Sequence, residues 1–330
     1  MILVTGGAGY IGSHTVKALK AAGLDPVIFD NFSTGHRSFV KNTAAFEGDI
    51  CNPADLEKAF SIYTIDGVLH FAGKALVGES AEKPELYQQT NVVGGMNLLT
   101  AMKNHGVRHF IFSSTCATYG EPEQVPIPED HPQKPINVYG QTKLDFERAL
   151  KAFHADYGIA YLSLRYFNAA GADADGEFGE DHTPETHLIP LTMQAAAGDR
   201  PEVKIFGTDY PTPDGTCLRD YIHVSDLARA HVMGLQLLMK NRISSQAINL
   251  GTGYGYSVRE VIEAVRRVTG RDFIVRETAR RPGDPPKLIA SADRAKAVLG
   301  WTAKESDIEN IVSSAWNWYQ RLNAPSVPAR

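Results

Sequence analysis

The sequence predicts an α/β fold in which a doubly wound parallel sheet is joined to a smaller, mixed α/β C-terminal lobe. Two observations predict it. Short apolar runs alternate with amphipathic stretches up to about Ala170, and beyond that point polar segments, short strands and separate helices follow one another irregularly. Strands that alternate with helices form right-handed βαβ units, and the helices of such units cover both faces of a parallel sheet.

The first part of the chain carries recognisable strand and helix patterns. Its apolar runs predict strands at Ile2–Thr5, Pro26–Asp30, Ala44–Glu47, Gly67–His70, Phe110–Ser113 and Ile159–Leu164. Its amphipathic stretches predict helices at Ile11–Ala22, Pro53–Ser61, Pro84–His105 and Tyr139–Tyr157. Three of these helices are followed directly by Gly23, Gly106 and Gly158. Glycine adopts the left-handed conformation of a helix C-terminus at the lowest cost, so these boundaries are well marked.

The second part has no regular alternation. Residues 171–190 are polar and predict a long loop. Strands are expected at Val203–Phe206 and Ala247–Leu250, and helices at Val224–Leu238, Val258–Val268, Ser291–Leu299 and Asp307–Arg321. This part therefore predicts a lobe that closes over the edge of the sheet.

The composition excludes several classes of protein. A chain of 330 residues, 43% of them hydrophobic and with a net charge of −5, has enough apolar material for a large core and too little charge for a disordered state. The near balance of basic and acidic residues provides no positive field for nucleic acid. No apolar run approaches the length of a membrane-spanning helix, and Cys51, Cys116 and Cys217 form no Cys-x-x-Cys pair. We expect a cytoplasmic protein that binds neither nucleic acid nor membrane.

A glycine-rich loop follows the first predicted strand and opens the first helix. Gly6, Gly9 and Gly12 are spaced as G-x-x-G-x-x-G. Such glycines permit a tight turn, the approach of a phosphate to the backbone, and close packing of helix on strand, while the helix N-terminus attracts a pyrophosphate. A strand–helix turn that binds nothing gives the same spacing, so the loop alone leaves both interpretations open.

Two acidic residues follow the next strands. Asp30 ends the second strand at the position expected of a carboxylate that binds the adenosine ribose and repels a 2′-phosphate, which favours NAD over NADP. Asp49 follows the third strand and is a candidate acceptor for the adenine amino group. Both acids fit equally well as caps of the turn or helix that comes next.

Tyr139 and Lys143 lie four residues apart near the start of a predicted helix, and Tyr139 is the only tyrosine with a lysine at this spacing. The two side chains share a helix face, and a nearby ammonium together with a positive nicotinamide ring favours the phenolate as a base. The strand before this helix ends in Ser113, Ser114 and Thr115, so that Thr115 is placed to hydrogen-bond both a substrate oxygen and Tyr139. A solvated tyrosine–lysine pair and a strand-end turn are the plainer readings.

Together these residues resemble the extended short-chain dehydrogenase/reductase family, and within it the enzymes that epimerise UDP-sugars at C4. The supporting segments are Val4–Thr15, Gly48–Ile50, HFAGKALVGES at His70–Ser80, Phe110–Gly120, Tyr139–Lys143, LRYFNAAG at Leu164–Gly171, RDYIHVSD at Arg219–Asp226, Asn249–Gly253 and RRPGD at Arg280–Asp284. They extend over almost the whole chain. The resemblance implies a Rossmann-type NAD-binding domain at residues 1–172, with a returning segment at about 224–251, and a UDP-sugar-binding lobe at 173–223 and 252–330.

The resemblance also implies a reversible interconversion of UDP-galactose and UDP-glucose with tightly bound NAD. Tyr139 would take the proton of the 4-hydroxyl while C4 gives a hydride to the nicotinamide; the 4-keto sugar would turn within the pocket and receive the hydride on its other face. Lys143 would bind the nicotinamide ribose and depress the pKa of Tyr139, and Thr115 would hydrogen-bond the 4-oxygen or relay its proton.

The implied binding residues form two sets. The NAD set comprises Gly6, Gly9, Tyr10, Ile11, Gly12, Asp30, Asn31, Asp49, Ile50, Phe71, Ala72, Gly73, Asn91, Ser113, Tyr139, Lys143 and Tyr166. The UDP-sugar set comprises Thr115, Tyr139, Asn168, Leu188, Phe206, Arg219, Tyr221, Arg281, Asp284 and Leu288. Two guanidinium groups suit a pyrophosphate because each can donate two hydrogen bonds.

Other activities on the same scaffold remain open. Leu288 stands where relatives that exclude N-acetylated sugars have a bulky tyrosine, so a UDP-N-acetylhexosamine is an alternative substrate, as are UDP-uronic acids and UDP-pentoses. A 4,6-dehydratase needs an acid pair after Thr115, where this chain has Cys116 and Ala117. A non-catalytic NAD-binding scaffold is a more distant alternative.

We expect no metal site, because His182 lies near Glu180 and Asp181 without a His-Glu-x-x-His spacing. Cys116 beside the expected active site is either a reactive thiol or a buried structural cysteine. The resemblance implies a homodimer that pairs the helices predicted at Pro84–His105 and Tyr139–Tyr157.

Overall fold

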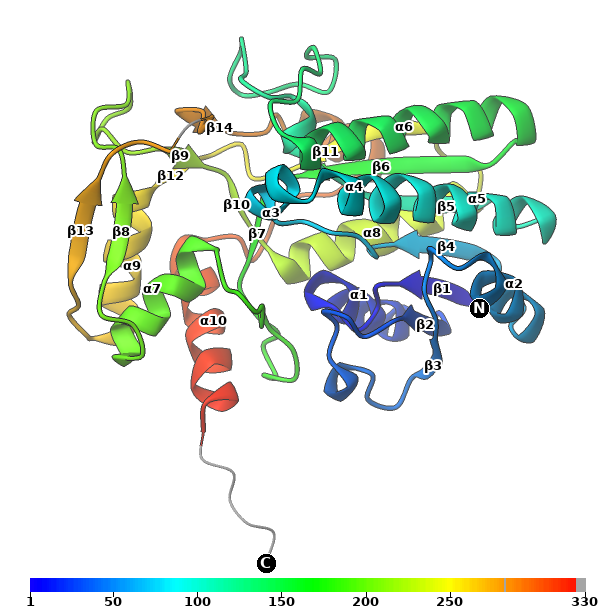
Figure 1. Cartoon of the computed structure of the whole chain (residues 1–330), viewed down its shortest axis with the longest axis horizontal. Helices are drawn as coiled ribbons and strands as arrows, with labels where there is room; N and C mark the ends of the chain where they lie inside the picture. The colour runs from blue at the N-terminus through cyan, green and yellow to red at the C-terminus, as the bar shows by residue number, and fades with distance from the viewer. Residues whose placement is uncertain (282, 325–330) are drawn as a thin grey trace, which may run out of the picture.

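The computed structural model describes residues 1–281 and 283–324, so the last six residues of the predicted UDP-sugar lobe lie outside the described part. Its centre is a parallel sheet of seven strands in the order β11-β6-β5-β4-β1-β2-β3 (Figure 1). The strands are β1 (Ile2–Thr5), β2 (Pro26–Asp30), β3 (Ala44–Glu47), β4 (Gly67–His70), β5 (His109–Thr115), β6 (Ala160–Tyr166) and β11 (Gln246–Leu250). The sheet predicted from the first part of the sequence is confirmed.

The strand order reverses between β1 and β4, which pair in register with Thr5 opposite His70. On one side of this point the chain proceeds through β2 and β3, and on the other through β4, β5 and β6. Open α/β sheets bind ligands at such a reversal, outside the carboxyl ends of the strands. These ends point toward the C-terminal part of the chain (Figure 1).

Helices cover both faces of the sheet, as a doubly wound fold requires. One apolar core includes Val16 and Leu19 of α1 (Tyr10–Ala21) and Leu227 and Leu235 of α8 (Val224–Met239). The other core lies beneath α2 (Pro53–Ile62), α5 (Gly95–Asn104) and α6 (Val138–Tyr157). The strands between them are buried on both faces because each face has its own layer of helices.

The segment before α5 contains α3 (Val77–Glu82), α4 (Pro84–Tyr87) and η2 (Gln88–Gly94). The sequence predicts one helix over Pro84–His105. The structure keeps a nearly continuous helical rod there but widens it to a π-helix at η2, and such widening often accompanies functional sites. Short 3-10 turns, η1 (Arg37–Phe39) and η3 (Cys116–Thr118), follow β2 and β5.

The C-terminal lobe has its own core, made where α7 (Leu188–Ala197), α9 (Val258–Thr269) and α10 (Ile308–Leu322) meet. Its small sheets pair β8 (Val203–Phe206) with β13 (Val275–Thr278), and β9 (Leu218–Arg219) with β12 (Tyr256–Ser257) and β14 (Lys287–Leu288). A further pair, β7 (Asn168–Ala170) with β10 (Tyr221–His223), continues from the end of β6. Figure 1 shows this lobe beside the carboxyl edge of the central sheet.

The structure departs from the sequence prediction at several boundaries. Helix α7 begins inside the segment expected to be a loop, and the helix expected at Ser291–Leu299 is largely the π-helical turn η4 (Ala295–Leu299). The two-residue strands of the lobe were not predicted, because segments this short carry no periodic signal. Strand β5 runs on to Thr115, so its three hydroxyl residues belong to the strand rather than to a turn.

Candidate active site

The glycine loop between β1 and α1 has the shape of a phosphate cradle. Gly6 has a φ of +71°, and a Cβ there would lie 2.5 Å from the backbone nitrogen of Ala72. A Cβ on Gly12 would lie 2.1 Å from the carbonyl oxygen of Gly6. Helix α1 follows Gly9 with no side-chain cap and no acidic residue in its first turn, so its free N–H groups remain available to an anion.

Tyr10 also connects this loop to the C-terminal half of the chain. Its hydroxyl donates to the carbonyl oxygen of Gly171 at 2.6 Å. The side chain therefore ties the start of α1 to the segment that leaves β7. Ile11 and Gly12 follow it in the first turn of α1, where the sequence analysis places the NAD phosphates.

Asp30 lies at the carboxyl end of β2 against the same loop. Its carboxylate accepts hydrogen bonds from the backbone N–H groups of Ala8 and Phe32, at 3.0 and 2.9 Å. Burial raises the pKa of Asp30, and these two hydrogen bonds act in the opposite direction. Asp30 thus caps its own turn, as the plainer reading expected, and it also lies beside the cradle, as a ribose ligand should.

Asn31 and Asp49 form the rim beyond Asp30. The Asn31 side-chain amide donates to Asp49 at 3.0 Å, and Asp49 also accepts from the backbone N–H of Cys51 at 2.8 Å. Ile50, which lies between Asp49 and Cys51 in the sequence, is buried in the core beneath α5. Four residues of the expected NAD set, Asp30, Asn31, Asp49 and Ile50, therefore lie near the ends of the neighbouring strands β2 and β3.

The loop after β4 is held by Asn91 of the π-helix η2. The Asn91 side chain accepts from the backbone N–H of Lys74 at 2.8 Å and donates to the Lys74 carbonyl at 3.0 Å and to the Thr142 hydroxyl at 3.1 Å. A Cβ on Gly73 would lie 2.9 Å from the Asn91 side-chain oxygen and 3.8 Å from Lys143 Nζ. The Phe71 ring packs at a tilt against His231, with ring centres 4.8 Å apart, and its backbone N–H donates to the Thr5 carbonyl oxygen at the end of β1.

The predicted helix with Tyr139 and Lys143 is confirmed as α6. Asn137 caps it by accepting from the Gly140 N–H at 2.8 Å, and Gly158 ends it in the left-handed conformation. Lys143 is buried and donates to the Ser113 carbonyl oxygen at 2.9 Å, with Nζ 5.9 Å from the centre of the Tyr139 ring. The Ser113 hydroxyl is hydrogen-bonded to the hydroxyl of buried Tyr166.

The pKa values of this pair are set by burial. Burial raises the pKa of Tyr139 to about 12, and a hydrogen bond with Thr115 works against that rise. Burial lowers the pKa of Lys143 to about 8, and Glu147 opposes that change. The lowering of the Tyr139 pKa that the sequence analysis expects of Lys143 is therefore not present in the protein alone, where desolvation of the phenolate outweighs every other effect.

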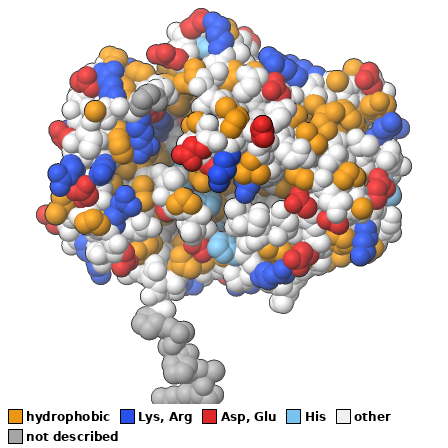
Figure 2. All heavy atoms as spheres, in the orientation of Figure 1, with side chains coloured by type: hydrophobic (Ala, Val, Ile, Leu, Met, Phe, Trp, Pro, Cys, Tyr) orange, Lys and Arg blue, Asp and Glu red, His pale blue; other side chains and the backbone are white. Residues whose placement is uncertain are grey.

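The substrate-binding candidates form pairwise contacts within the C-terminal lobe. Arg219 forms an ion pair with Asp284, and the Arg281 guanidinium lies 3.8 Å from the centre of the Phe206 ring. Leu288 is the register partner of Arg219 between β14 and β9. Figure 2 shows the surface hollowed between the C-terminal lobe, at the left, and the sheet domain, with Lys and Arg side chains in the wall.

The remaining candidates lie around this group. Asn168 starts β7, and its backbone N–H donates to the Asp220 carbonyl next to Arg219. Tyr221 is buried beside Arg219, whereas Leu188 is half-buried at the first position of α7. Cys116 is buried too, and burial raises the pKa of its thiol to about 12, which disfavours the reactive thiolate.

The profile of the NAD dependent epimerase/dehydratase family matches residues 2–251 of this chain. The chain belongs to that family. It is 49% identical to the UDP-glucose 4-epimerase of Halalkalibacterium halodurans over 97% of this chain and 95% of that protein.

Solved structures of similar enzymes support this family assignment. The crystal structure of UDP-glucose 4-epimerase from Brucella ovis in complex with NAD is 50% identical, with a TM-score of 0.93 over 96% of this chain and 98% of that one. The Bifidobacterium longum enzyme in complex with NAD⁺ and UDP is 39% identical, with a TM-score of 0.90 over 98% of each chain.

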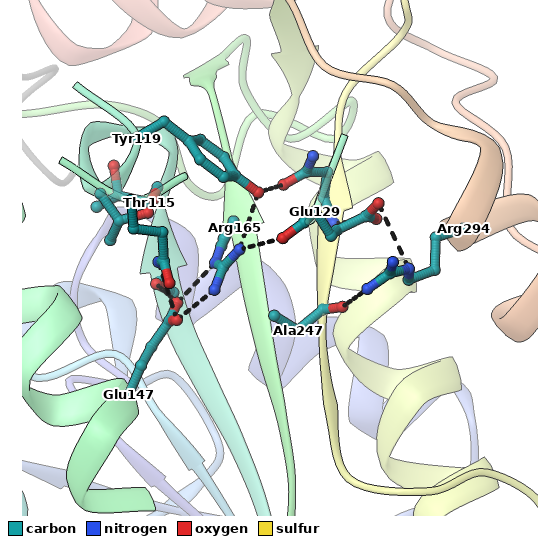
Figure 3. A network of polar contacts seen from close by, with 11 residues as sticks. Thr115, Tyr119, Glu129, Glu147, Arg165, Ala247 and Arg294 are labelled. Atoms are coloured by element: carbon teal, nitrogen blue, oxygen red, sulfur yellow. Dashed lines mark hydrogen bonds and ion pairs between the residues drawn. The ribbon is translucent and has the colours of Figure 1, made fainter. Parts of the chain in front are cut away.

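A buried polar network behind the active site was missed by the sequence analysis (Figure 3). Glu147 of α6 forms an ion pair with Arg165 of β6, and each side chain is only 3% exposed. Arg165 also donates to Tyr119 at 2.9 Å, and Tyr119 donates to Asn249 of β11 at 2.7 Å. The network joins α6, β6 and β11 directly beneath the strand that carries Thr115.

The network extends to the loop before α6. The backbone N–H of Asn249 donates to Glu129 at 2.9 Å, and Glu129 is paired with Arg294 at 3.5 Å. No spacing in the sequence links these residues, which come from five separate segments. The one available signal is that Glu147 lies four residues after Lys143, on the face of α6 that carries Tyr139.

Proposed function

We propose that the chain interconverts UDP-galactose and UDP-glucose with tightly held NAD and without net oxidation or reduction. The observation that carries this proposal is a chain of contacts through Tyr139 and Lys143. Lys143 Nζ lies 5.9 Å from the centre of the Tyr139 ring and would lie 3.8 Å from a Cβ on Gly73, the neighbour of Ala72, whose backbone packs against Gly6 of the cradle. On the other side, the charge of Arg219, which is paired with Asp284, acts on Cys116, the neighbour of Thr115. Such an arrangement is expected of a base and its hydroxyl partner between a dinucleotide site and a diphosphate site.

The residues of the cradle fit NAD. The loop packs closely because Gly6 and Gly12 carry no side chain at positions where a Cβ would collide with backbone, and the uncapped N-terminus of α1 presents its N–H groups to a pyrophosphate. The buried Asp30 carboxylate beside this loop suits two ribose hydroxyls and opposes a 2′-phosphate. Bound NAD would take up the C4 hydride of the sugar and return it.

The chain's own groups handle the proton and the orientation of the sugar. Tyr139 accepts the 4-hydroxyl proton, and Thr115, hydrogen-bonded to Tyr139, relays it or holds the 4-oxygen. Lys143, whose Nζ donates to the Ser113 carbonyl and lies near Gly73, would bind the nicotinamide ribose. Its positive charge, together with that of the nicotinamide ring, would favour the phenolate of Tyr139.

The UDP moiety is held away from the reacting carbon. Arg219 and Arg281 bind the diphosphate, and Asp284, already paired with Arg219, accepts from the uridine ribose. The remaining contacts to the UDP moiety come from Asn168, Leu188, Phe206 and Tyr221. Binding energy from the nucleotide then leaves the sugar free to present either face of C4.

The decisive experiment supplies UDP-galactose to the purified protein without added NAD and follows the sugar nucleotides by chromatography. Formation of UDP-glucose up to an equilibrium ratio is expected. Absence of product, even after NAD is supplied, would contradict the proposal and favour a non-catalytic scaffold or a uronic-acid nucleotide as substrate.

A wider sugar range is a second candidate function, favoured by Leu288. This residue is half-buried beside Arg219 and packs toward Cys116, Ile127 and Phe167. A leucine leaves more room at this point than a tyrosine, so we propose that UDP-N-acetylhexosamines also enter. Dehydration is disfavoured because Cys116 and Ala117, after Thr115, carry no acid.

We also propose a homodimer. Of the apolar residues on its expected helices, Leu99, Leu144, Phe146 and Leu150 are buried within one chain and only cover the sheet. Leu86 and Val93 remain 37% and 38% exposed on α4 and η2, and nearby α3 exposes Val77. Sedimentation at micromolar concentration tests this, and a monomer would contradict it.

Among the described residues, no helix is both long and apolar enough to cross a membrane.

A further inference from the structure

Four potential metal ligands meet in the loop that leads into α7. Glu180, His182, Glu185 and His187 each place one ligand atom within 4.8 Å of all the others. Their spacing is Glu-x-His-x-x-Glu-x-His. No metal is expected here from the sequence, because His182 lies near Glu180 and Asp181 without a His-Glu-x-x-His spacing.

The separations between these atoms suit a tetrahedral ion. Zinc binds histidine nitrogen and carboxylate oxygen at about 2.0–2.2 Å, which places two ligands of a tetrahedron roughly 3.3–3.6 Å apart. His182 Nδ1 lies 3.2 Å from Glu180 Oε1 and 3.9 Å from Glu185 Oε2. His187 Nδ1 lies 3.6 Å from Glu185 Oε1 and is hydrogen-bonded to Glu180 at a closer approach than two ligands of one ion allow, so this hydrogen bond must open when an ion binds.

One ligand atom lacks a partner. His182 Nδ1 is buried, and among the described residues it has no hydrogen-bond partner, although Glu180 lies within reach. A buried polar atom without a partner is costly, and a bound ion is one recognised explanation.

The negative charge of the two glutamates also favours a bound cation. The Glu180 and Glu185 side chains are only 7% and 8% exposed, and within the described chain their ion-pair partners are His182 and His187 rather than a lysine or arginine. With both imidazoles neutral, the cluster carries two negative charges, which one divalent cation neutralises. Two imidazole ligands favour zinc over calcium or magnesium.

A second cluster nearby provides a contrast. Asp173, Asp175 and Glu177 also gather their carboxylates, but Lys17 Nζ lies at 2.9, 2.6 and 3.1 Å from the three. The Lys17 ammonium group therefore already serves as the cation of this carboxylate cluster. The presence of this cluster in the same loop offers a matched control.

The backbone around the histidine cluster is fixed from two sides. Trp318 of α10 donates to the Glu180 carbonyl at 3.0 Å, and the His36 ring contacts the Asp181 carbonyl at 2.9 Å. The ligands are therefore held in place by elements from both halves of the chain. His182 and His187 are 31% and 50% exposed, which leaves an ion a path from solvent.

We propose that Glu180, His182, Glu185 and His187 bind one structural zinc ion that fixes the loop between the two halves of the chain. The ion takes no part in the sugar chemistry. Its role is to hold the start of α7 against the segment after β2, since His36 of that segment and Trp318 of α10 both contact the loop that carries the ligands.

The test uses the full chain with any purification tag removed and metal stripped with a chelator. Zinc chloride is titrated back, and bound metal is counted by mass spectrometry. One zinc per chain and a higher melting temperature than in chelator are expected. Replacement by Co²⁺ is expected to give the intense visible absorption of a tetrahedral site.

The variants His182→Gln and His187→Gln are expected to weaken zinc affinity at least about 10- to 100-fold, the loss that changes at outer partners of metal sites already cause. Asp175→Asn, from the cluster that Lys17 neutralises, is expected to bind like the parent. Failure of the parent to bind zinc, or equal binding by the histidine variants, would overturn the proposal. If a variant fails to fold, the Co²⁺ spectrum of the parent decides alone: without tetrahedral bands the proposal is wrong.

Discussion

Lys143 and Glu147, one turn apart on α6, bind two successive residues at the end of β5. Lys143 Nζ donates to the Ser113 carbonyl oxygen at 2.9 Å, and Glu147 accepts from the Ser114 hydroxyl at 2.6 Å. The helix that carries Tyr139 is thereby locked to the strand that carries Thr115. The relative position of Tyr139 and Thr115 therefore depends on two hydrogen bonds in which neither of these residues takes part.

Replacement of Tyr139 by phenylalanine is expected to retain NAD and UDP-sugar binding but to lower kcat by about 10²–10⁴-fold, the usual contribution of a positioned acid or base. The value of kcat and the affinities for NAD and UDP-sugar should be measured separately. Tyr157→Phe, on the same helix and 42% exposed, is the matched control and should match the parent. If the Tyr139 variant stayed as active as the parent, Tyr139 would not be the base.

The Tyr139 pKa should fall when NAD binds. In the protein alone burial holds it near 12, whereas a positive nicotinamide ring and Lys143 favour the phenolate. Activity should therefore rise with pH up to a value below 12. In Lys143→Met the rise should move to higher pH, because a positive charge is lost; an unchanged pH profile would contradict this role of Lys143.

Glu147→Gln should destabilise the fold by about 3–5 kcal/mol, because it leaves the buried guanidinium of Arg165 without its charge partner. Denaturant unfolding measures the change. Glu123→Gln, which breaks the exposed pair with Lys134, is the control and should leave stability unchanged. Equal stability of the two variants would mean that the Glu147–Arg165 pair contributes nothing.

Leu288→Tyr should reduce the use of UDP-N-acetylgalactosamine relative to UDP-galactose by about tenfold or more, since steric exclusion in a pocket is typically worth 1–3 kcal/mol. The ratio of kcat/KM for the two sugars measures it. Loss of both activities together would indicate disruption of β14 rather than altered selectivity.

Stability should fall steadily as pH drops below about 6.5. Burial lowers the pKa of His14, His223 and His231 to about 4 and that of His70 to about 3. The unfolded chain therefore binds more protons than the fold between pH 6.5 and 4, and each such histidine contributes a slope of about 1.4 kcal/mol per pH unit. Denaturant unfolding from pH 7 to 5 tests this, and a flat profile would contradict it.

Local patterns in the sequence were sufficient for much of the fold and site. The glycine loop, the strand-end acids and the Tyr139–Lys143 pair depend on short-range spacing, which backbone geometry and helical periodicity translate directly into position. Helix α6 and strands β1 to β4 appear where predicted because their periodicity and end residues agree.

Only the tertiary structure decided how distant segments meet. The network of Glu147, Arg165 and Asn249, the widening of η2 around Asn91, and the histidine–glutamate cluster all join groups whose partners the sequence does not mark. The pKa of Tyr139 belongs here as well. Burial is a property of the packed chain, so the pattern that identifies the base cannot report how strongly desolvation opposes its ionisation.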